Sequence, residues 1–257
     1  MTNAPARRVV LALPAYNEEI SLPAVLQRFD RVAAGAGWNY AAVVVDDGSS
    51  DGTAGVLRNA PASLALKVVV HAQNRGLGET IVDALAEASR LAGNGGIVVT
   101  MDADNTHSPE LIPELVRRIE KGNDIAIASR YRPGSRVIGL SRFRHSMSYG
   151  ARFLFQSLLP MQGVRDYTCS FRAYRAELLE RAFALYGPSL ARERGFACMA
   201  EILVKLGALG ARAAEIPMEL RYDIKGGASK MNVGLTAANT LRLILRLRRS
   251  RCVPVQP

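Results

Sequence analysis

The sequence predicts an α/β protein with a mostly parallel, doubly wound sheet and helices on both faces. Short apolar runs alternate with helical segments through the first half of the chain, and we expect strands at residues 8–13, 40–45, 66–71, 96–101 and 124–128. Polar residues follow almost every run, at the strand ends where such sheets bind ligands. The 257 residues are enough for one large domain or two small ones with a sizeable core.

Helix boundaries follow from turn and capping residues. Ser21 is a candidate N-cap with Pro23 in the first turn of a helix that ends before Gly35. The expected helices cover residues 21–34, 53–59, 79–92, 108–121, 141–159, 176–185 and 196–206. We expect a loop and strand at 166–174, and an edge strand at 211–220 that is interrupted by Pro217.

Composition narrows the class of protein. A net charge of +10 favours anionic partners: nucleotides, phosphorylated lipids, membrane surfaces or nucleic acid. We expect no signal peptide, because the first eight residues lack an apolar stretch, and no run is long enough to span a bilayer. The three cysteines have no paired or metal-type spacing, which indicates free thiols in a reducing compartment: Cys169, Cys198 and Cys252.

Two carboxylates, Asp102 and Asp104, follow the apolar run at 96–101. Side chains at i and i+2 of an extended segment point to the same side, so these two can converge on one point. Two such carboxylates repel each other unless a cation lies between them, and a hard divalent cation with oxygen ligands fits there. The alternative is a turn with two solvated aspartates.

Positive charge gathers in two segments. Residues 130–165 hold seven arginines and no acidic residue, and residues 224–257 hold seven Lys or Arg and no acidic residue. Within a helix over 234–251, Arg242, Arg246 and Arg249 share one face, and the rest is largely apolar through Leu241, Ile244, Leu245 and Leu247. Residues 235–249 would span only about 20 Å, too short for a bilayer core of about 30 Å. We expect this helix to lie on an anionic membrane surface; docking on the protein's own sheet or on a membrane partner subunit are the alternatives.

Several short motifs occur together in a fixed order. They lie at residues 14–18 (PAYNE), 45–53 (VDDGSSDGT), 74–78 (NRGLG), 102–104 (DAD) with His107 and Pro109-Glu110, 129–131 (SRY), 166–168 (DYT) with Phe171-Arg172, Pro217, and 229–230 (SK). This set resembles the family 2 glycosyltransferases of the GT-A fold, and within them the dolichyl- or polyprenyl-phosphate mannosyltransferases. The resemblance covers almost the whole chain. It implies a GT-A domain over 1–230, with a nucleotide-sugar half at 1–128 and an acceptor half at 129–230, followed by the basic amphipathic helix and tail at 231–257.

The resemblance also implies residue roles. The metal, Mg²⁺ or Mn²⁺, would be held by Asp102 and Asp104. The nucleotide sugar would be bound by Pro14, Tyr16, Glu18, Asp46, Asp47, Arg75, Asp102, Ala103, Asp104, Asp166 and Arg221. The acceptor phosphate would be bound by Arg130, Arg144 and Ser148, and the catalytic set would be Asp102, Asp104, Arg130, Arg144 and Lys230.

The chain departs from the family pattern at three places. Asn105-Thr106 stands where the family often has Leu-Gln or Leu-Ser, and Cys169-Ser170 stands where it usually has Ser-Gly. Arg221 and Lys225 compete for one arginine position. Framework roles are expected for Thr168 and Arg172, and His107 is expected to orient its loop.

The implied reaction is transfer of a sugar, with GDP-mannose as the expected donor, to a polyprenyl or dolichyl phosphate at the cytoplasmic face of a membrane. Direct displacement would invert the anomeric carbon. A phosphate monoester is already a nucleophile at neutral pH, so the reaction needs no strong general base. Expected partners are therefore the nucleotide sugar, the lipid phosphate and the membrane surface, with a small membrane-anchoring subunit as an open alternative.

Two other functions stay open. A family 2 enzyme that transfers from a UDP-glucose or UDP-GlcNAc type donor to a hydroxyl would need a carboxylate base, for which Glu193 and Glu201 are candidates. A non-catalytic basic module that binds nucleic acid would satisfy the charge but has no recognised motif here, and we expect no nucleic-acid partner. A nucleotidyltransferase would usually have a glycine-rich loop after the first strand, where this chain has Pro14 to Glu18.

Overall fold

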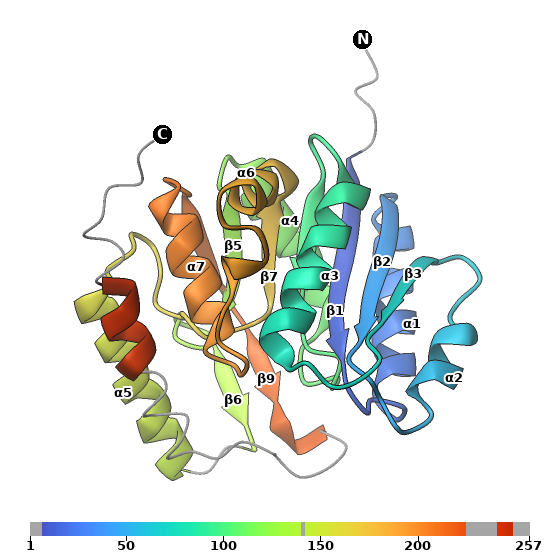
Figure 1. Ribbon diagram of the computed structural model, residues 1–257, viewed down its shortest axis with the longest axis horizontal. Coiled ribbons are helices and arrows are strands. Elements are labelled where there is room, and N and C mark those ends of the chain that lie inside the picture. The colour runs from blue at the N-terminus through green and yellow to red at the C-terminus, as the bar shows by residue number, and fades with distance from the viewer. Residues whose placement is uncertain (1–6, 140–141, 225–240, 249–257) are drawn as a thin grey trace.

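The computed structural model describes residues 7–139, 142–224 and 241–248 of the chain (Figure 1). Within these residues it has a seven-stranded sheet and a separate pair of short strands. The sheet order is β3 (Ala65–Val70), β2 (Asn39–Asp46), β1 (Arg8–Ala15), β4 (Ile97–Thr100), β7 (Arg172–Arg175), β5 (Ile125–Ser129) and β8 (Ala213–Pro217). The five strands predicted from apolar runs are confirmed, and their ends differ from the predicted ends by no more than two residues.

The sheet is parallel except at β7, which pairs antiparallel with both β4 and β5. Strands β1, β2, β4 and β5 are continuous apolar runs that are almost wholly buried, as expected for strands covered on both faces. Strand β8 lies at the edge of the sheet and ends at Pro217, which confirms the predicted edge strand.

Helices cover both faces of the sheet (Figure 1). In that view α3 (Leu77–Ala92), α6 (Ala176–Tyr186) and α7 (Cys198–Ala208) lie in front, and α1 (Leu22–Gly35) and α4 (Ile112–Glu120) lie behind. The short α2 (Thr53–Arg58) follows β2, and single 3-10 turns are η1 (Pro109–Leu111), η2 (Gly187–Leu190) and η3 (Tyr222–Ile224).

The predicted cap of α1 is wrong in one respect. Pro23 lies in the first turn as expected, but the Ser21 side chain makes no capping hydrogen bond. Its backbone is helical, with φ −90° and ψ −38°, whereas an N-cap residue needs an extended backbone to turn its oxygen toward the first amides.

The second half adds elements beyond the sheet. Strands β6 (Arg136–Ile138) and β9 (Glu219–Arg221) form a small parallel pair, and α5 (Arg142–Leu158) lies at the side of the molecule (Figure 1). Residues 241–248 form a helix beside α5 and α7. Among the residues that the structure describes, no helix combines the length and the apolar character needed to cross a bilayer.

Candidate active site

The loops after β1, β2 and β4 meet at the carboxyl edge of the sheet, the lower edge in Figure 1. The Asp47 amide donates to the Ala15 carbonyl at 2.9 Å, which joins the first two loops. The Asn17 amide donates to the Ser49 hydroxyl at 2.9 Å, and the Ser50 amide donates to the Asn17 side chain at 2.8 Å. Asn17 has a φ of +56°, a left-handed conformation that asparagine tolerates better than most residues.

Asp102 and Asp104 lie in the loop directly after β4, as predicted, although not on the strand itself. Asp102 Oδ1 accepts a hydrogen bond of 2.7 Å from the Ser170 hydroxyl. Asp104 is 8% exposed, and its Oδ1 accepts from the Thr106 amide at 3.1 Å and from the Thr106 hydroxyl at 2.6 Å. The intervening Ala103 is buried.

The loop beyond these carboxylates is fixed to α1. Arg28 donates to the Asn105 side chain at 2.8 Å and to the Ser108 hydroxyl at 2.9 Å, and it forms an ion pair with Glu110. Asn105 has a φ of +60°. His107 does orient its loop, because its Nδ1 accepts from the Asp102 amide at 3.2 Å while its ring stacks on Phe171.

Asp46 and Asp47 are both buried at the end of β2. Asp46 Oδ1 accepts from the Ser49 amide at 3.0 Å. Asp47 organises the 74–78 loop instead, because it accepts from the amides of Arg75 and Gly76 at 2.9 Å each and lies 2.7 Å from His71 Nδ1. Burial raises the pKa of Asp47, but these hydrogen bonds outweigh it, so the pKa lies below the usual value. Of the two, Asp46 has the carboxylate less engaged with the 74–78 loop.

The glycines of the 74–78 loop permit a close approach to the 193–194 segment. A Cβ on Gly78 would lie 1.9 Å from the Glu193 carbonyl oxygen, and the Gly78 amide donates to the Arg194 carbonyl at 3.2 Å. Gly76 has a φ of +93°. The loop next to the predicted diphosphate position thus packs directly on the acceptor half of the chain.

Arg75 is half-exposed and forms ion pairs with Glu79 and, at 3.1 Å, with Asp83. Its positive charge is therefore partly balanced by α3 before any diphosphate arrives. Pro14 is half-buried near the end of β1, and Tyr16, two residues further on, is 39% exposed. The Glu18 amide donates to the Thr53 hydroxyl at 2.9 Å.

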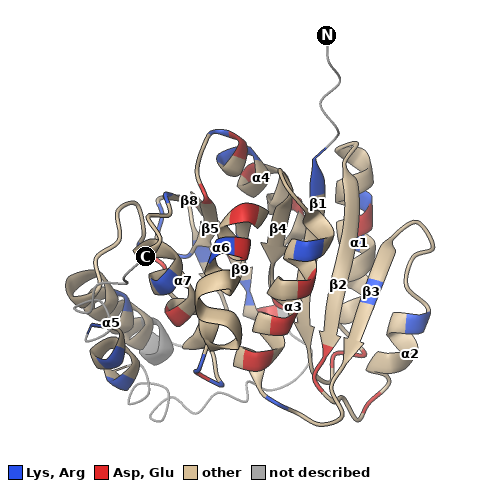
Figure 2. Cartoon of the chain, turned by 45° about the horizontal axis from the view of Figure 1, so that its top comes forward, with Lys and Arg blue, Asp and Glu red and all other residues tan. Residues whose placement is uncertain are grey.

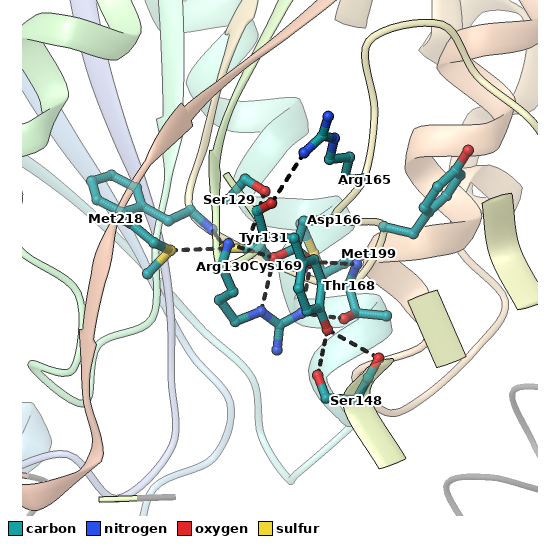
Figure 3. Close-up of polar contacts among 12 residues, drawn as sticks. Ser129, Arg130, Tyr131, Ser148, Arg165, Asp166, Thr168, Cys169, Met199 and Met218 are labelled. Carbon is teal, nitrogen blue, oxygen red and sulfur yellow. Dashed lines mark hydrogen bonds and ion pairs between the residues drawn. The ribbon is translucent and has the colours of Figure 1, made fainter. Parts of the chain in front are cut away.

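Arg130, directly after β5, and Asp166, in the segment before β7, form a buried ion pair (Figure 3). Asp166 is wholly buried and accepts from Arg130 Nε at 2.8 Å, Nη2 at 2.6 Å and the amide at 3.0 Å. Burial raises the pKa of Asp166, but the charge and hydrogen bonds of Arg130 outweigh it, so the pKa lies below the usual value. The guanidinium also donates to the Thr168 hydroxyl at 2.6 Å. The arginine predicted to face the acceptor phosphate is thus already held by the aspartate predicted to lie near the sugar.

The remaining predicted residues are placed less tightly. Ser148 on α5 is bonded to the Tyr131 hydroxyl (Figure 3), and the backbone of Arg144 lies one turn earlier on that helix. The side chain of Arg144 and all of Lys230 lie outside the described residues. Arg221 pairs with Asp223 at 2.8 Å, while its amide donates to the Thr106 carbonyl at 3.2 Å.

The expectation of a C-terminal helix with all its leucines on a membrane is wrong for residues 241–248. Leu243, Ile244 and Leu247 are buried in the core of the protein, whereas Leu241 and Leu245 are about half exposed. Arg246, predicted to face lipid headgroups, instead pairs with Glu193 at 3.0 Å and Glu201 at 3.1 Å. The alternative of docking on the protein itself holds for these residues, because three apolar side chains are buried and Arg246 forms ion pairs with two glutamates of the protein.

Sequence reasoning missed several residues that shape the site. Ser170 was noted only as a departure from a glycine, and Arg28, His71 and Glu215 were not singled out. Glu215 is buried and accepts from the amides of Arg165 and Asp166 at 2.6 and 2.7 Å, and burial raises its pKa. A carboxylate in the edge strand at 211–220 was the available signal.

The donor atoms at the edge of the sheet fit a divalent cation with oxygen ligands. In the described part of the chain, no cluster of three or more His, Cys, Asp or Glu is placed to hold a metal. The two carboxylates would thus supply part of a coordination shell that water and substrate phosphates complete, which is the usual arrangement for Mg²⁺.

Comparisons with known proteins agree with this geometry. The family model described as Glycosyl transferase family 2 matches residues 11–183 of the chain. Dolichol-phosphate mannosyltransferase of Pyrococcus furiosus is 34% identical over 242 residues, which are 93% of this chain and 63% of that protein. Polyprenol monophosphomannose synthase of Mycolicibacterium smegmatis is 35% identical over 70% of this chain and 66% of its own length. The chain thus spans about two thirds, or slightly less, of the length of these two relatives.

Solved structures show the same fold at lower identity. Glucosyl-3-phosphoglycerate synthase of Mycobacterium tuberculosis, solved with Mn²⁺, UDP and glucosyl-3-phosphoglycerate, has a TM-score of 0.64 at 23% identity, over 97% of this chain and 81% of that one. Mannosyl-3-phosphoglycerate synthase of Rubrobacter xylanophilus has a TM-score of 0.64 at 19% identity, over 98% of this chain and 77% of that one. The predicted GT-A-like fold is confirmed. Because the family match runs from β1 into α6 and takes in the loops after β1, β2 and β4, the chain belongs to glycosyl transferase family 2.

Proposed function

We propose that this glycosyltransferase moves a sugar from a nucleotide sugar to a polyprenyl phosphate, with inversion at the anomeric carbon and with Mg²⁺ or Mn²⁺ as cofactor. The names of its relatives support a lipid phosphate acceptor: two are a dolichol-phosphate and a polyprenol phosphate mannose enzyme. A third, from Klebsiella pneumoniae, is an undecaprenyl-phosphate 4-deoxy-4-formamido-L-arabinose transferase at 33% identity. The acceptor class is common to all three while the sugar varies, and GDP-mannose is the donor that we propose first.

The observation that carries the proposal is the opposite charge of two parts of the chain: carboxylates after β4 and arginines on α5. Asp102 and Asp104 lie at the end of β4, while α5 holds three arginines and no acidic residue (Figure 2). An enzyme that joins two anionic substrates must compensate charge on both. A carboxylate pair that recruits a cation serves the diphosphate, and arginines serve the acceptor phosphate.

In the proposed reaction an oxygen of the acceptor phosphate attacks the anomeric carbon, and the bond from that carbon to the diphosphate oxygen breaks. A cation held by Asp102 and Asp104 would offset the charge of the leaving diphosphate. Arg144 would hold the attacking phosphate, because Arg130 is already engaged with Asp166 and contributes its charge from within that pair. Lys230 and Arg75 are proposed to lie near the diphosphate.

A hydroxyl acceptor is the second candidate, and the surroundings of Glu193 and Glu201, the two candidates for its carboxylate base, argue against it. Glu201 is 1% exposed, accepts from the amides of Arg192 and Glu193, and pairs with Lys205 at 2.7 Å. Glu193 pairs with Arg246. A general base must reach the substrate proton, and neither carboxylate is placed to do so.

A membrane surface is proposed as the place of work, at its cytoplasmic face. Helix α5 exposes Tyr149, Phe153 and Leu154, with Phe153 at 70%, and the Arg152 guanidinium lies over the Tyr149 ring. Exposed aromatic and apolar side chains among cations are typical of helices that lie in the headgroup region. Since the tail helix is docked at 241–248, the lipid contact is assigned mainly to α5.

The proposal is tested by incubating the protein with a panel of radiolabelled nucleotide sugars and a polyprenyl phosphate, with and without Mn²⁺ or Mg²⁺. Label extracted into organic solvent identifies the donor and the acceptor class together. We expect Asp104→Ala, or excess chelator, to abolish transfer, and Asp30→Ala on α1 to leave it intact. Full activity in excess EDTA would contradict the proposed metal role.

Arg144→Ala tests the acceptor site separately. A charge-assisted contact to phosphate contributes about 1.5 to 3 kcal/mol, so KM for the lipid phosphate should rise about tenfold to a hundredfold. KM for the nucleotide sugar should change little. Arg117→Ala, on the exposed face of α4, is the matched control. An equal rise for both substrates would move the acceptor site elsewhere.

A further inference from the structure

Each carboxylate of the Asp102–Asp104 pair has one oxygen held by a neighbouring hydroxyl. The Ser170 hydroxyl donates to Asp102 Oδ1 at 2.7 Å, and the Thr106 hydroxyl donates to Asp104 Oδ1 at 2.6 Å. Ser170 is 6% exposed and Thr106 is 3% exposed, so little water competes for either contact.

The fold brings Ser170 to this place through the antiparallel strand β7. Thr100 of β4 pairs with Arg172 of β7, so the residues just before β7 run beside the residues just after β4. The Thr100 hydroxyl donates to the Ser170 carbonyl at 2.6 Å in the buried interior, which fixes the Ser170 backbone. The hydroxyl is therefore presented by a segment that precedes β7 and is hydrogen-bonded to the end of β4.

Both hydroxyls lie where this chain departs from the family pattern. Ser170 stands in place of the glycine, and Thr106 stands in place of glutamine or serine. Ser170 is not among the described residues with positive φ, so its position makes no demand that only glycine meets. The side chain at 170 is thus an addition that contacts a proposed metal ligand.

His107 does not duplicate the Ser170 contact. Its Nδ1 accepts from the Asp102 amide at 3.2 Å, and the Asp102 Oδ2 atom lies 4.0 Å from the same nitrogen, too far for a hydrogen bond. The ring therefore fixes the Asp102 backbone, whereas Ser170 fixes the carboxylate.

We propose that Ser170 and Thr106 are positioning residues whose hydroxyls set the orientation of the two carboxylates toward a divalent cation. The inference rests on the proposed metal-dependent function. Hydrogen bonds to the outer side of ligating carboxylates fix the ligand geometry and typically change metal affinity about 10-fold to 100-fold when removed. We expect Ser170→Ala to weaken metal-dependent binding of a nucleoside diphosphate about tenfold or more, and Thr106→Val to act in the same direction.

The experiment measures binding, not turnover. GDP and UDP are each titrated into the full chain by calorimetry in saturating Mn²⁺ and again in EDTA, and the ratio of the two affinities is the metal-dependent gain. Ser170→Thr keeps the hydroxyl and should restore the gain that Ser170→Ala loses. Ser89→Ala removes an equally buried hydroxyl on α3, bonded only locally to the Ala86 carbonyl at 3.0 Å, and should leave the gain unchanged.

The outcomes separate the inference from the function. A wild-type protein that binds both nucleotides equally in Mn²⁺ and in EDTA overturns the metal-dependent function and the inference with it. A wild-type gain that Ser170→Ala and Thr106→Val both retain overturns only the positioning role. Ser170→Gly provides the same test if the alanine variant fails to fold.

Discussion

Removing the charge of Asp166 is the sharpest test of how the acceptor half is held together. Asp166→Asn keeps the size of the side chain but leaves the buried Arg130 guanidinium without its counter-charge. In the wild type the carboxylate accepts from three groups of Arg130 and from the amides of Thr168 and Cys169, at 3.3 and 3.1 Å (Figure 3). An asparagine has one acceptor oxygen, and its NH₂ group would face the Arg130 donors.

The magnitude follows from burial. Breaking a buried ion pair by removing one partner destabilises a protein by about 3 to 5 kcal/mol. For a domain of this size each kcal/mol lowers Tm by about 2 to 4 °C, so we expect a loss of roughly 6 to 20 °C. The Asp166 side chain is fully buried and only 17% of the Arg130 side chain is exposed. Solvent therefore screens the ion pair little, and the expected loss of stability needs little reduction.

The pH dependence has a defined sign. The folded-state pKa of Asp166 lies below its usual value, so the pair contributes stability above the unfolded pKa of about 3.9. That contribution is lost as pH falls from there through the folded pKa. The difference in unfolding free energy between the wild type and Asp166→Asn should be full at neutral pH and should shrink below about pH 4.

Urea unfolding at several pH values measures that difference. Glu114→Gln is the control, because Glu114 pairs with Arg117 and Arg118 on the exposed surface of α4 and should contribute about 1 kcal/mol or less. If Asp166→Asn costs no more than this control, or if the difference does not shrink in acid, the Arg130–Asp166 pair does not hold the acceptor half.

Two further substitutions test packing. Leu243→Ala in the C-terminal helix should cost about 2 to 5 kcal/mol, whereas Leu245→Ala, 50% exposed, should stay within about 0.5 kcal/mol; equal effects in urea unfolding would mean that this helix is not docked. Gly78→Ala should lower both stability and nucleotide affinity, because its Cβ would lie 1.9 Å from the Glu193 carbonyl. Gly150→Ala on α5, with no atom within 4 Å of its Cβ, should be neutral or up to about 1 kcal/mol stabilising, and a Gly78 variant that behaves the same way would contradict the close packing.

Much of the fold was predictable because buried parallel strands are continuous apolar runs. The direction of β7 was not predictable, since an apolar run does not reveal which way a strand points, and β7 pairs antiparallel with β4. Strands β6 and β9 have three residues each, too few for any periodicity to stand out. The buried Arg172 was expected to be framework, and it is, with its guanidinium bonded to the carbonyls of Met199 and Tyr167 at 2.8 and 2.7 Å.

The candidate site was predictable where one segment carries the chemistry, as with Asp102 and Asp104 after β4. It was less predictable where residues far apart in the chain compete for the same partner. Arg75 lies on the expected loop, yet Glu79 and Asp83 share its charge. The spacing of motifs along the sequence predicts which residues lie in a loop. The partner that each of their side chains contacts depends on the three-dimensional fold.

The segment at 166–170 connects both halves of the proposed reaction. Its first residue, Asp166, fixes Arg130 beside the proposed acceptor side, and its last, Ser170, fixes Asp102 on the donor side. The segment leads into strand β7, which lies between β4 and β5, so one continuous stretch of backbone carries both contacts. A change that shifts its backbone should therefore weaken donor and acceptor binding at once, whereas a change on α5, such as Arg144→Ala, should affect the acceptor alone. Because β7 runs antiparallel to β4, the residues that precede β7, rather than those that follow it, lie at the carboxyl edge of the sheet and carry both side chains.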